Sequence, residues 1–196
     1  GEKDFPGLYQ SADQSSVNEQ KKYFTGIGIY LILLIIAAIL SYFDNMLNEP
    51  LLKIFSAILF LATLSIMIWL RVSKPDDIWY NGRAVAESVK TRTWRWMMKA
   101  DPYEIEDENL VRKHFVSDLK TILSQNESLI GKLGSQVSIE EPISENMIQI
   151  RALSREERFN FYRTNRITNQ AIWYTKKAKF NKHKSEFWFW STVGLH

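Results

Sequence analysis

The stretch Tyr23–Phe43, YFTGIGIYLILLIIAAILSYF, decides the fold together with a second apolar run, Leu51–Leu70, LLKIFSAILFLATLSIMIWL. Each run has about the 20 residues that an α-helix needs to cross the ~30 Å hydrocarbon core of a bilayer. The first run holds no Asp, Glu, Lys, Arg or His, and the second holds only Lys53 of these, close to its start. The short connection 44–50 permits little except a tight reversal. The sequence therefore predicts a transmembrane helical hairpin.

Two other interpretations of these runs fit the sequence less well. A soluble helix that is apolar on every face needs a large surrounding core, which 196 residues with 24% charged side chains can hardly supply. A cleaved signal peptide would be shorter, would begin nearer the N-terminus and would not be followed at once by a second span. The expected fold class is an all-α integral membrane protein.

Flanking charge predicts the orientation of the hairpin. Lys21 and Lys22 precede the first run, Arg71 and Lys74 follow the second, and the connection carries only acidic charge. The positive-inside rule then places both ends in the cytoplasm of a multi-pass plasma (inner) membrane protein. The chain has no cysteine, which suits a reducing compartment. The expected domains are a cytoplasmic N-terminal segment 1–22, membrane helices 23–43 and 51–70 with the external loop 44–50, a cytoplasmic helical domain 71–186, and a terminal membrane segment 187–196.

The cytoplasmic domain is expected to be helical. A helix should run from about Asp76 to Lys99, and a second from about Glu108 to Gln125, where apolar side chains recur on one face. These side chains are Val111, Phe115, Leu119 and Ile122. Residues 126–143 are predicted to form a loop. Helical character resumes near Ser144, and a long helix should run from about Ser154 to the end.

The C-terminal part is strongly basic and ends in aromatic residues. Residues 151–184 include ten Lys or Arg and only two Glu, whereas residues 76–150 include 13 acidic and 9 basic side chains. We expect the basic residues to contact anionic lipid headgroups and to fix the cytoplasmic side, in preference to binding nucleic acid. The basic residues assigned to lipid are Lys176, Lys179, Lys182 and Lys184. The final FWFWSTVGLH, 187–196, predicts the start of a third membrane helix, the alternative being an interfacial anchor.

The residues indicate no catalytic, cofactor or metal site. The three histidines are far apart in the sequence, and no phosphate-binding glycine loop is present. An acidic cluster beside the second cytoplasmic helix is interpreted as a solvated helix start and not as a cation site. The cluster consists of Glu104, Glu106, Asp107 and Glu108. We therefore expect that the protein is not an enzyme.

Small and hydroxyl side chains in the two runs are candidates for close helix contacts or for a pore lining. They are Gly26, Gly28, Ala37, Ala38, Ser56, Ala62, Thr63 and Ser65. Because no charge lies at midplane depth, a pore built from these helices would have an apolar constriction and no charged selectivity ring.

The stretch IWYNGRAVAESVK, 78–90, followed by TWRW, 93–96, resembles the segment after the second membrane helix in the SLATT superfamily of two-transmembrane effector domains. The leader FPGLYQSADQSS, 5–16, is similar to the N-terminal approach of that family to the membrane. The matching positions after the hairpin form a stalk between the membrane and the cytoplasmic helices. They are Trp79, Arg83, Glu87, Lys90 and Trp94.

The segment from Arg155 onward is similar to the pre-membrane helix of a second SLATT unit. Its matching positions are Arg158, Tyr162, Arg166, Gln170, Trp173, Tyr174 and Lys177. The resemblance implies a homo-oligomeric effector of a bacterial conflict or antiviral defence system, which forms a pore or disrupts the membrane when a linked sensor or second-messenger module detects a signal. The alternative is a non-conducting membrane scaffold whose cytoplasmic helices recruit a partner protein.

Overall fold

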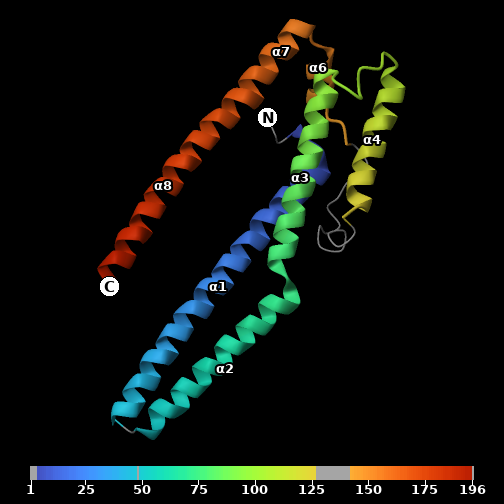
Figure 1. Ribbon diagram of the computed structural model, residues 1–196. Helices are drawn as coiled ribbons and strands as arrows, with labels where there is room; N and C mark the ends of the chain where they lie inside the picture. The colour runs from blue at the N-terminus through green and yellow to red at the C-terminus, as the bar shows by residue number, and fades with distance from the viewer. Residues whose placement is uncertain (1–3, 48, 127–141, 196) are drawn as a thin grey trace.

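The computed structural model describes residues 4–47, 49–126 and 142–195, and these residues contain helices and no strand (Figure 1). The all-α fold class is thereby confirmed, and α1 and α2 are both long and apolar enough to cross a membrane. The elements are α1 (Gly7–Leu47), α2 (Pro50–Ser73), α3 (Pro75–Met98), α4 (Glu108–Ser124), α6 (Glu145–Ala152), α7 (Arg155–Tyr162), the π-helix η2 (Arg163–Thr168) and α8 (Asn169–Leu195).

Helix α1 is much longer than its apolar run. It has 41 residues and is about 60 Å long at 1.5 Å per residue. It includes most of the N-terminal segment 1–22, to which the sequence analysis assigned no secondary structure. Leu8, Tyr9, Ala12 and Ser16 are buried, at the spacing of one helical face. This face packs on α3. At its other end α1 continues to Leu47, which shortens the connection expected at 44–50.

The boundary between α2 and α3 is a single residue. Lys74 has the left-handed backbone angles φ 45° and ψ 53°, and its N–H donates to the carbonyl of Leu70 at 3.0 Å. Pro75 then opens α3, where the missing proline N–H costs no helical hydrogen bond. Asp76 and Asp77 occupy the first turn, where negative charge is favourable. The chain therefore bends at Lys74, whereas α1 runs unbroken past the same level.

The hydrophobic core lies away from the hairpin, where α3, α4 and α6 meet the start of α1. Trp96, Phe115 and Met147 are among its fully buried side chains. The apolar face predicted for α4 is confirmed, because Val111, Phe115 and Leu119 are buried and Ile122 packs against them. The side chain of Asp107 caps α4 by accepting from two of its N–H groups.

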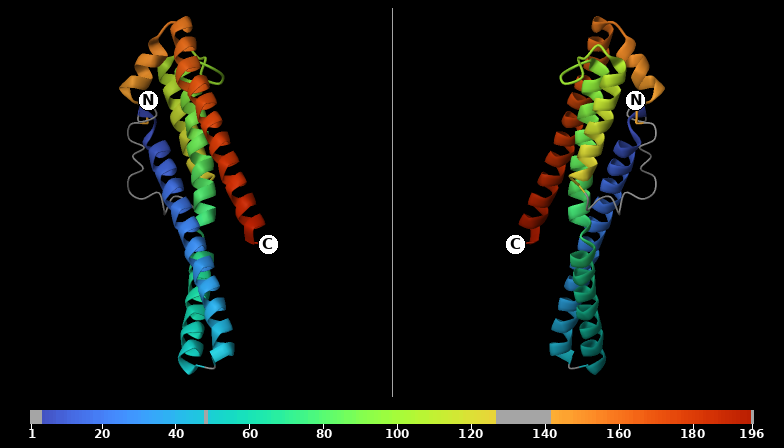
Figure 2. Two further views of the ribbon diagram at one scale, coloured as in Figure 1. Left: turned by 90° about the vertical axis from the view of Figure 1, so that its left-hand side faces the viewer. Right: turned by 90° about the vertical axis from the view of Figure 1, so that its right-hand side faces the viewer.

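The last helices leave this core. Ser154 and Glu157 form a capping box that starts α7, and α7, η2 and α8 follow one another directly. The long helix predicted from Ser154 therefore contains six residues with π-helical hydrogen bonding, between α7 and α8. Figure 2 shows α8 running from the far end of the core back toward the hairpin, with its C-terminus near the level of the α2–α3 junction. The loop predicted over 126–143 lies largely outside the described residues.

Candidate functional site

The two apolar helices pack along a seam of small and hydroxyl side chains. Ala37 is fully buried, and the Ser56 hydroxyl donates to its carbonyl oxygen across the seam at 3.3 Å. Thr63 is also buried, although its hydroxyl donates to Phe60 of its own helix. A Cβ at Gly26 would lie 2.9 Å from the Leu70 side chain, so this glycine permits close approach of the helices.

Other residues proposed for helix contacts lie elsewhere. A Cβ at Gly28 would meet nothing within 4 Å, and Ala38 and Ser65 are exposed. Ala62 is half-buried. Gly28, Ala38 and Ser65 therefore take no part in the close seam contacts within one copy of the chain.

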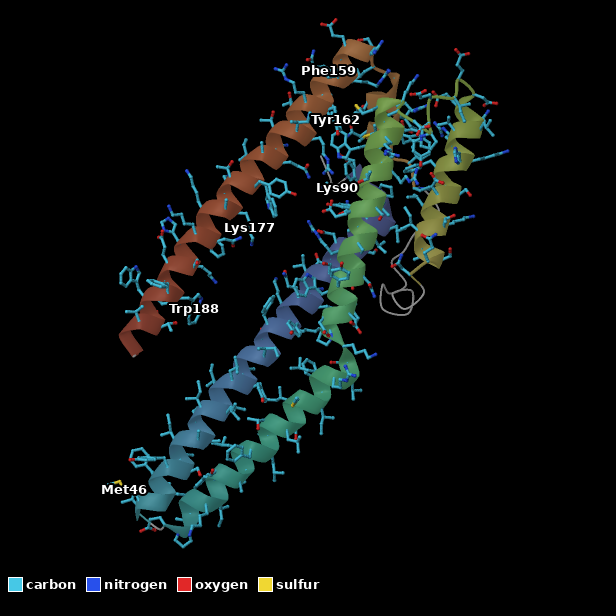
Figure 3. All side chains as sticks on the ribbon, in the orientation of Figure 1. Met46, Lys90, Phe159, Tyr162, Lys177 and Trp188 are labelled. Atoms are coloured by element: carbon cyan, nitrogen blue, oxygen red, sulfur yellow. The ribbon has the colours of Figure 1, made fainter. Side chains whose placement is uncertain are left out.

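The outer surface of the hairpin is apolar and exposed. Only 11% of each apolar window is buried inside the structure, unlike the core helix of a soluble protein. Large side chains such as Ile35 and Phe55 are 60% and 57% exposed. This surface is suited to lipid or to another hairpin. Met46 lies at the far end of the hairpin from the core (Figure 3).

The stalk residues of α3 contact α1. The Arg83 guanidinium pairs with Asp13 of α1 at 3.1 Å and with Glu87 of its own helix at 2.8 Å. Beside this pair, a Cβ at Gly82 would lie only 3.2 Å from the carbonyl oxygen of Ala12. The two helices therefore approach closely at this level, and the charged ladder is part of an interface.

The remaining stalk residues extend this interface in both directions. The ring of Trp79 lies 5.6 Å from that of Phe24, next to the hairpin. Lys90 lies over the ring of Tyr9 at 6.0 Å. Farther from the hairpin, Trp94 packs edge-to-face on Phe5, with 5.9 Å between ring centroids. The stalk is thus in contact with α1, and with Phe5 just before it, from the hairpin to the core.

The stalk and the second-unit residues line one cleft. A cavity of about 470 Å³ lies between α1, α3, α6 and the start of α8. From the stalk it is lined by Arg83, Glu87, Lys90 and Trp94. From the second unit it is lined by Arg166, Gln170, Trp173 and Tyr174. The structure therefore brings together two residue sets that the sequence placed about 80 positions apart.

Two second-unit residues lie beside the cleft and one lies away from it. Tyr162 packs edge-to-face on Trp94, with 5.4 Å between ring centroids, and Arg158 is half-buried next to it. Lys177 lies on the exposed part of α8, over the ring of Phe180 at 5.3 Å. The basic residues assigned to lipid, Lys176, Lys179, Lys182 and Lys184, are all exposed on this helix.

The aromatic end of α8 is exposed as well. Phe187, Trp188, Phe189 and Trp190 are each 61–67% exposed, on a helix with almost no buried side chain. Figure 3 places Trp188 near the free end of α8. An aromatic girdle next to a basic stretch is the pattern of a membrane boundary.

Sequence reasoning missed a buried arginine that joins three elements. Arg151 of α6 is 3% exposed and donates to both carboxylate oxygens of Glu108, at 3.2 and 2.9 Å. It also donates to the carbonyls of Trp96 at 2.6 Å and Tyr103 at 3.2 Å. Arg151 had been counted among the basic residues of the C-terminal stretch. Its position directly after the apolar Met147, Ile148 and Ile150 was the signal of burial.

Tyr103 completes this part of the core. Its hydroxyl donates to the carboxylate of Asp118. Burial, followed by this hydrogen bond, raises the pKa of the Tyr103 hydroxyl well above its usual range. The group therefore stays protonated and keeps its role as a donor.

Among residues 4–47, 49–126 and 142–195, no group of three or more His, Asp or Glu side chains has the arrangement of a metal site. Asp107 and Glu108 of the acidic cluster act as a helix cap and as the partner of Arg151. Glu104 and Glu106 are exposed.

Comparison with known families agrees with this arrangement. Residues 6–159 match the model of the SMODS and SLOG-associating 2TM effector domain 3, and residues 162–196 match that of the SMODS and SLOG-associating 2TM effector domain 1. The first match covers α1 to α6 and the first part of α7, and the second covers η2 and α8. The chain therefore belongs to the SLATT superfamily of membrane effector domains, which are associated with conflict and defence systems.

The resemblance stated from the sequence is thereby confirmed, and the chain is a membrane protein with two apolar helices. No curated protein and no solved structure matches it.

Proposed function

We propose that the chain is a cytoplasm-facing effector whose hairpins assemble, from several copies, into a pore or a membrane-disrupting cluster when a linked sensor is triggered. The observation that supports this most is the apolar hairpin surface, which is exposed on both helices and has no partner within one described copy. The balance of Lys and Arg around the hairpin supports a cytoplasmic bundle.

Control by the cytoplasmic part would act through the stalk. Helix α1 is one rigid element from the core to the far end of the hairpin, while α2 joins α3 through the bend at Lys74. A shift of α3 along α1 would therefore change the packing of α2 against α1 in the membrane. The Arg83–Asp13 pair and the close approach at Gly82 hold α3 in its present register.

The aromatic end of α8 would begin a third span. Helix α8 runs back toward the hairpin, and its exposed basic side chains precede the aromatic ones (Figure 2). This order fits a helix that contacts anionic headgroups and then enters lipid.

The test is release of a trapped dye and of ions from liposomes that contain the purified chain. We expect release to rise more steeply than in proportion to protein density, because several copies must meet. Gly82→Leu, which forces α1 and α3 apart, should change release severalfold, whereas Ala84→Leu on the exposed side of α3 should not. If chains cross-linked as oligomers release nothing at any density or on any trigger, pore formation is refuted and a non-conducting scaffold is favoured.

A further inference from the structure

A second cavity, of about 550 Å³, lies between the C-terminal half of α3 and the α7–η2 segment. We call it the arginine cavity, because Arg95, Arg155, Arg158 and Arg166 line it. No Asp or Glu is among the described residues around it. Its volume is within the usual range for small-molecule sites. Arg158 and Arg166 are half-buried and Arg95 and Arg155 are exposed, and four like charges around one cavity attract an anion.

The four arginines are not neutralised by the described part of the protein. The ion pairs found there involve other basic residues, such as Arg83, Arg92 and Arg151. Arg158 is held in place because its Nη1 donates to the carbonyl of Leu153 at 2.6 Å. Its Nε is nevertheless buried without an acceptor, and so is Nη1 of Arg166.

A third unpaired donor borders the same cavity. Trp94 is only 7% exposed, and its indole Nε1 has no hydrogen-bond acceptor. A buried donor without an acceptor is unfavourable, and native structures contain few of them. Three of the four unpaired buried side-chain atoms in the described residues belong to side chains that line this cavity, although Trp94 and Arg166 also line the first cleft. Guanidinium and indole donors gather at this cavity without a carboxylate among the described residues around it, which suits a ligand rich in anionic acceptor oxygens.

The side chains around the cavity indicate which kind of ligand would fit it. Guanidinium groups bind phosphate oxygens in a bidentate manner and keep their charge at every physiological pH. Trp94, Phe159 and Tyr162 add aromatic surface to the same cavity, and Figure 3 shows Phe159 and Tyr162 along α7 at this site. We infer that the arginine cavity binds a soluble ligand that carries two or more phosphoryl groups and a planar ring, as a nucleotide does.

A phospholipid headgroup offers the same phosphate chemistry, but the position of the cavity favours a soluble ligand. Trp94 lies 20 residues along α3 from Lys74, the bend beside the hairpin. At 1.5 Å per residue this is about 30 Å, and α3 extends away from the hairpin (Figure 1). A headgroup in the bilayer surface would not reach this far. This inference goes beyond the proposed membrane function and does not depend on it.

The test is calorimetric titration of the full chain, in nanodiscs of phosphatidylcholine, with ATP, pyrophosphate and inorganic phosphate. We expect saturable binding that weakens with added salt, with ATP tighter than pyrophosphate and pyrophosphate tighter than phosphate. The double variant Arg95→Gln/Arg166→Gln should weaken ATP binding about 100-fold, because two charged donors are lost. The matched control is Arg163→Gln, which removes an exposed arginine of η2 that does not line the cavity.

Three outcomes would overturn the inference. One is the absence of binding of all three probes at millimolar concentration by folded protein. Another is equal binding by the wild type, the double variant and the control, which would show non-specific attraction to basic side chains. The third is evidence that the bound phosphate belongs to a lipid. In that case anionic phospholipid in the nanodisc would raise the unfolding temperature of the wild type and of Arg163→Gln but not of the double variant, while soluble probes had no effect. Circular dichroism of each variant checks that its helices are intact.

Discussion

Replacement of Arg151 by alanine should destabilise the hydrophobic core of α3, α4 and α6 by about 3–5 kcal/mol. The substitution leaves the carbonyl of Tyr103 without the donor it has in the structure, at about 1–3 kcal/mol, whereas the carbonyl of Trp96 still accepts from the Lys99 N–H at 3.3 Å. It also removes the guanidinium that lies 4.9 Å from the centre of the Trp96 ring, and such contacts are worth about 2 kcal/mol when desolvated. Glu108 is half exposed, so water can replace its lost partner and its share is small.

The measurement is denaturant unfolding of the full chain in detergent micelles, followed by tryptophan fluorescence. The control is Arg112→Ala, an exposed arginine of α4, whose effect should stay below about 0.5 kcal/mol. Arg151→Met fills most of the same volume but makes no hydrogen bond. It should therefore recover only the part of the lost stability that comes from packing. A loss below about 1 kcal/mol for Arg151→Ala would show that these hydrogen bonds do not hold α6 to α3 and α4.

Three further changes test other parts of the structure. Ala37→Phe should overpack the hairpin seam and cost about 1–3 kcal/mol in detergent unfolding, whereas Ala38→Phe, on the exposed side, should be nearly neutral; equal effects would refute the seam. Lys74→Gly should raise stability by about 0.5–1 kcal/mol by relieving the left-handed backbone, and a loss would contradict that geometry. Folding raises the pKa of the Tyr103 hydroxyl, so its contribution to stability is complete below the unfolded-state pKa near 10 and is lost as the pH rises above that value. The wild type should therefore lose stability between pH 10 and 12 more steeply than Tyr103→Phe. Parallel curves of stability against pH would contradict this.

The two apolar helices and most of the remaining helices were predictable, because their signals are local. Apolar length defines the hairpin, and Pro75 marks the start of α3. The periodicity of Val111, Phe115 and Leu119 defines the buried face of α4. Each of these signals depends on residues within one or two turns of one another, so no knowledge of the tertiary arrangement is needed.

The docking of the N-terminal segment was not predictable in the same way. The pair of Arg83 with Asp13 joins residues 70 positions apart, and neither residue alone indicates its partner. The sequence predicts for residues 1–22 only a cytoplasmic segment that leads to the membrane. The spacing of Leu8, Ala12 and Ser16 was the available signal of a buried helical face.

The candidate site was predictable only as separate residues. The stalk and second-unit positions were named from the family resemblance, but their convergence on one cleft depends on how α7 and α8 fold back over α3. The arginine cavity was missed for a related reason. A run of basic residues is usually a solvated face, and only the structure shows that Arg158 and Arg166 line one cavity with Trp94.

The most direct test is topological labelling of the hairpin, because pore formation and its control both require that the hairpin spans the membrane with the bundle on one side. The chain has no cysteine, so Met46→Cys at the far end of the hairpin and Ser88→Cys on the exposed side of α3 each give a single reactive thiol. In intact spheroplasts a membrane-impermeant maleimide should label position 46 and not position 88, and both should be labelled after permeabilisation. Labelling of position 88 in intact cells, or of neither position after permeabilisation, would contradict the proposed arrangement.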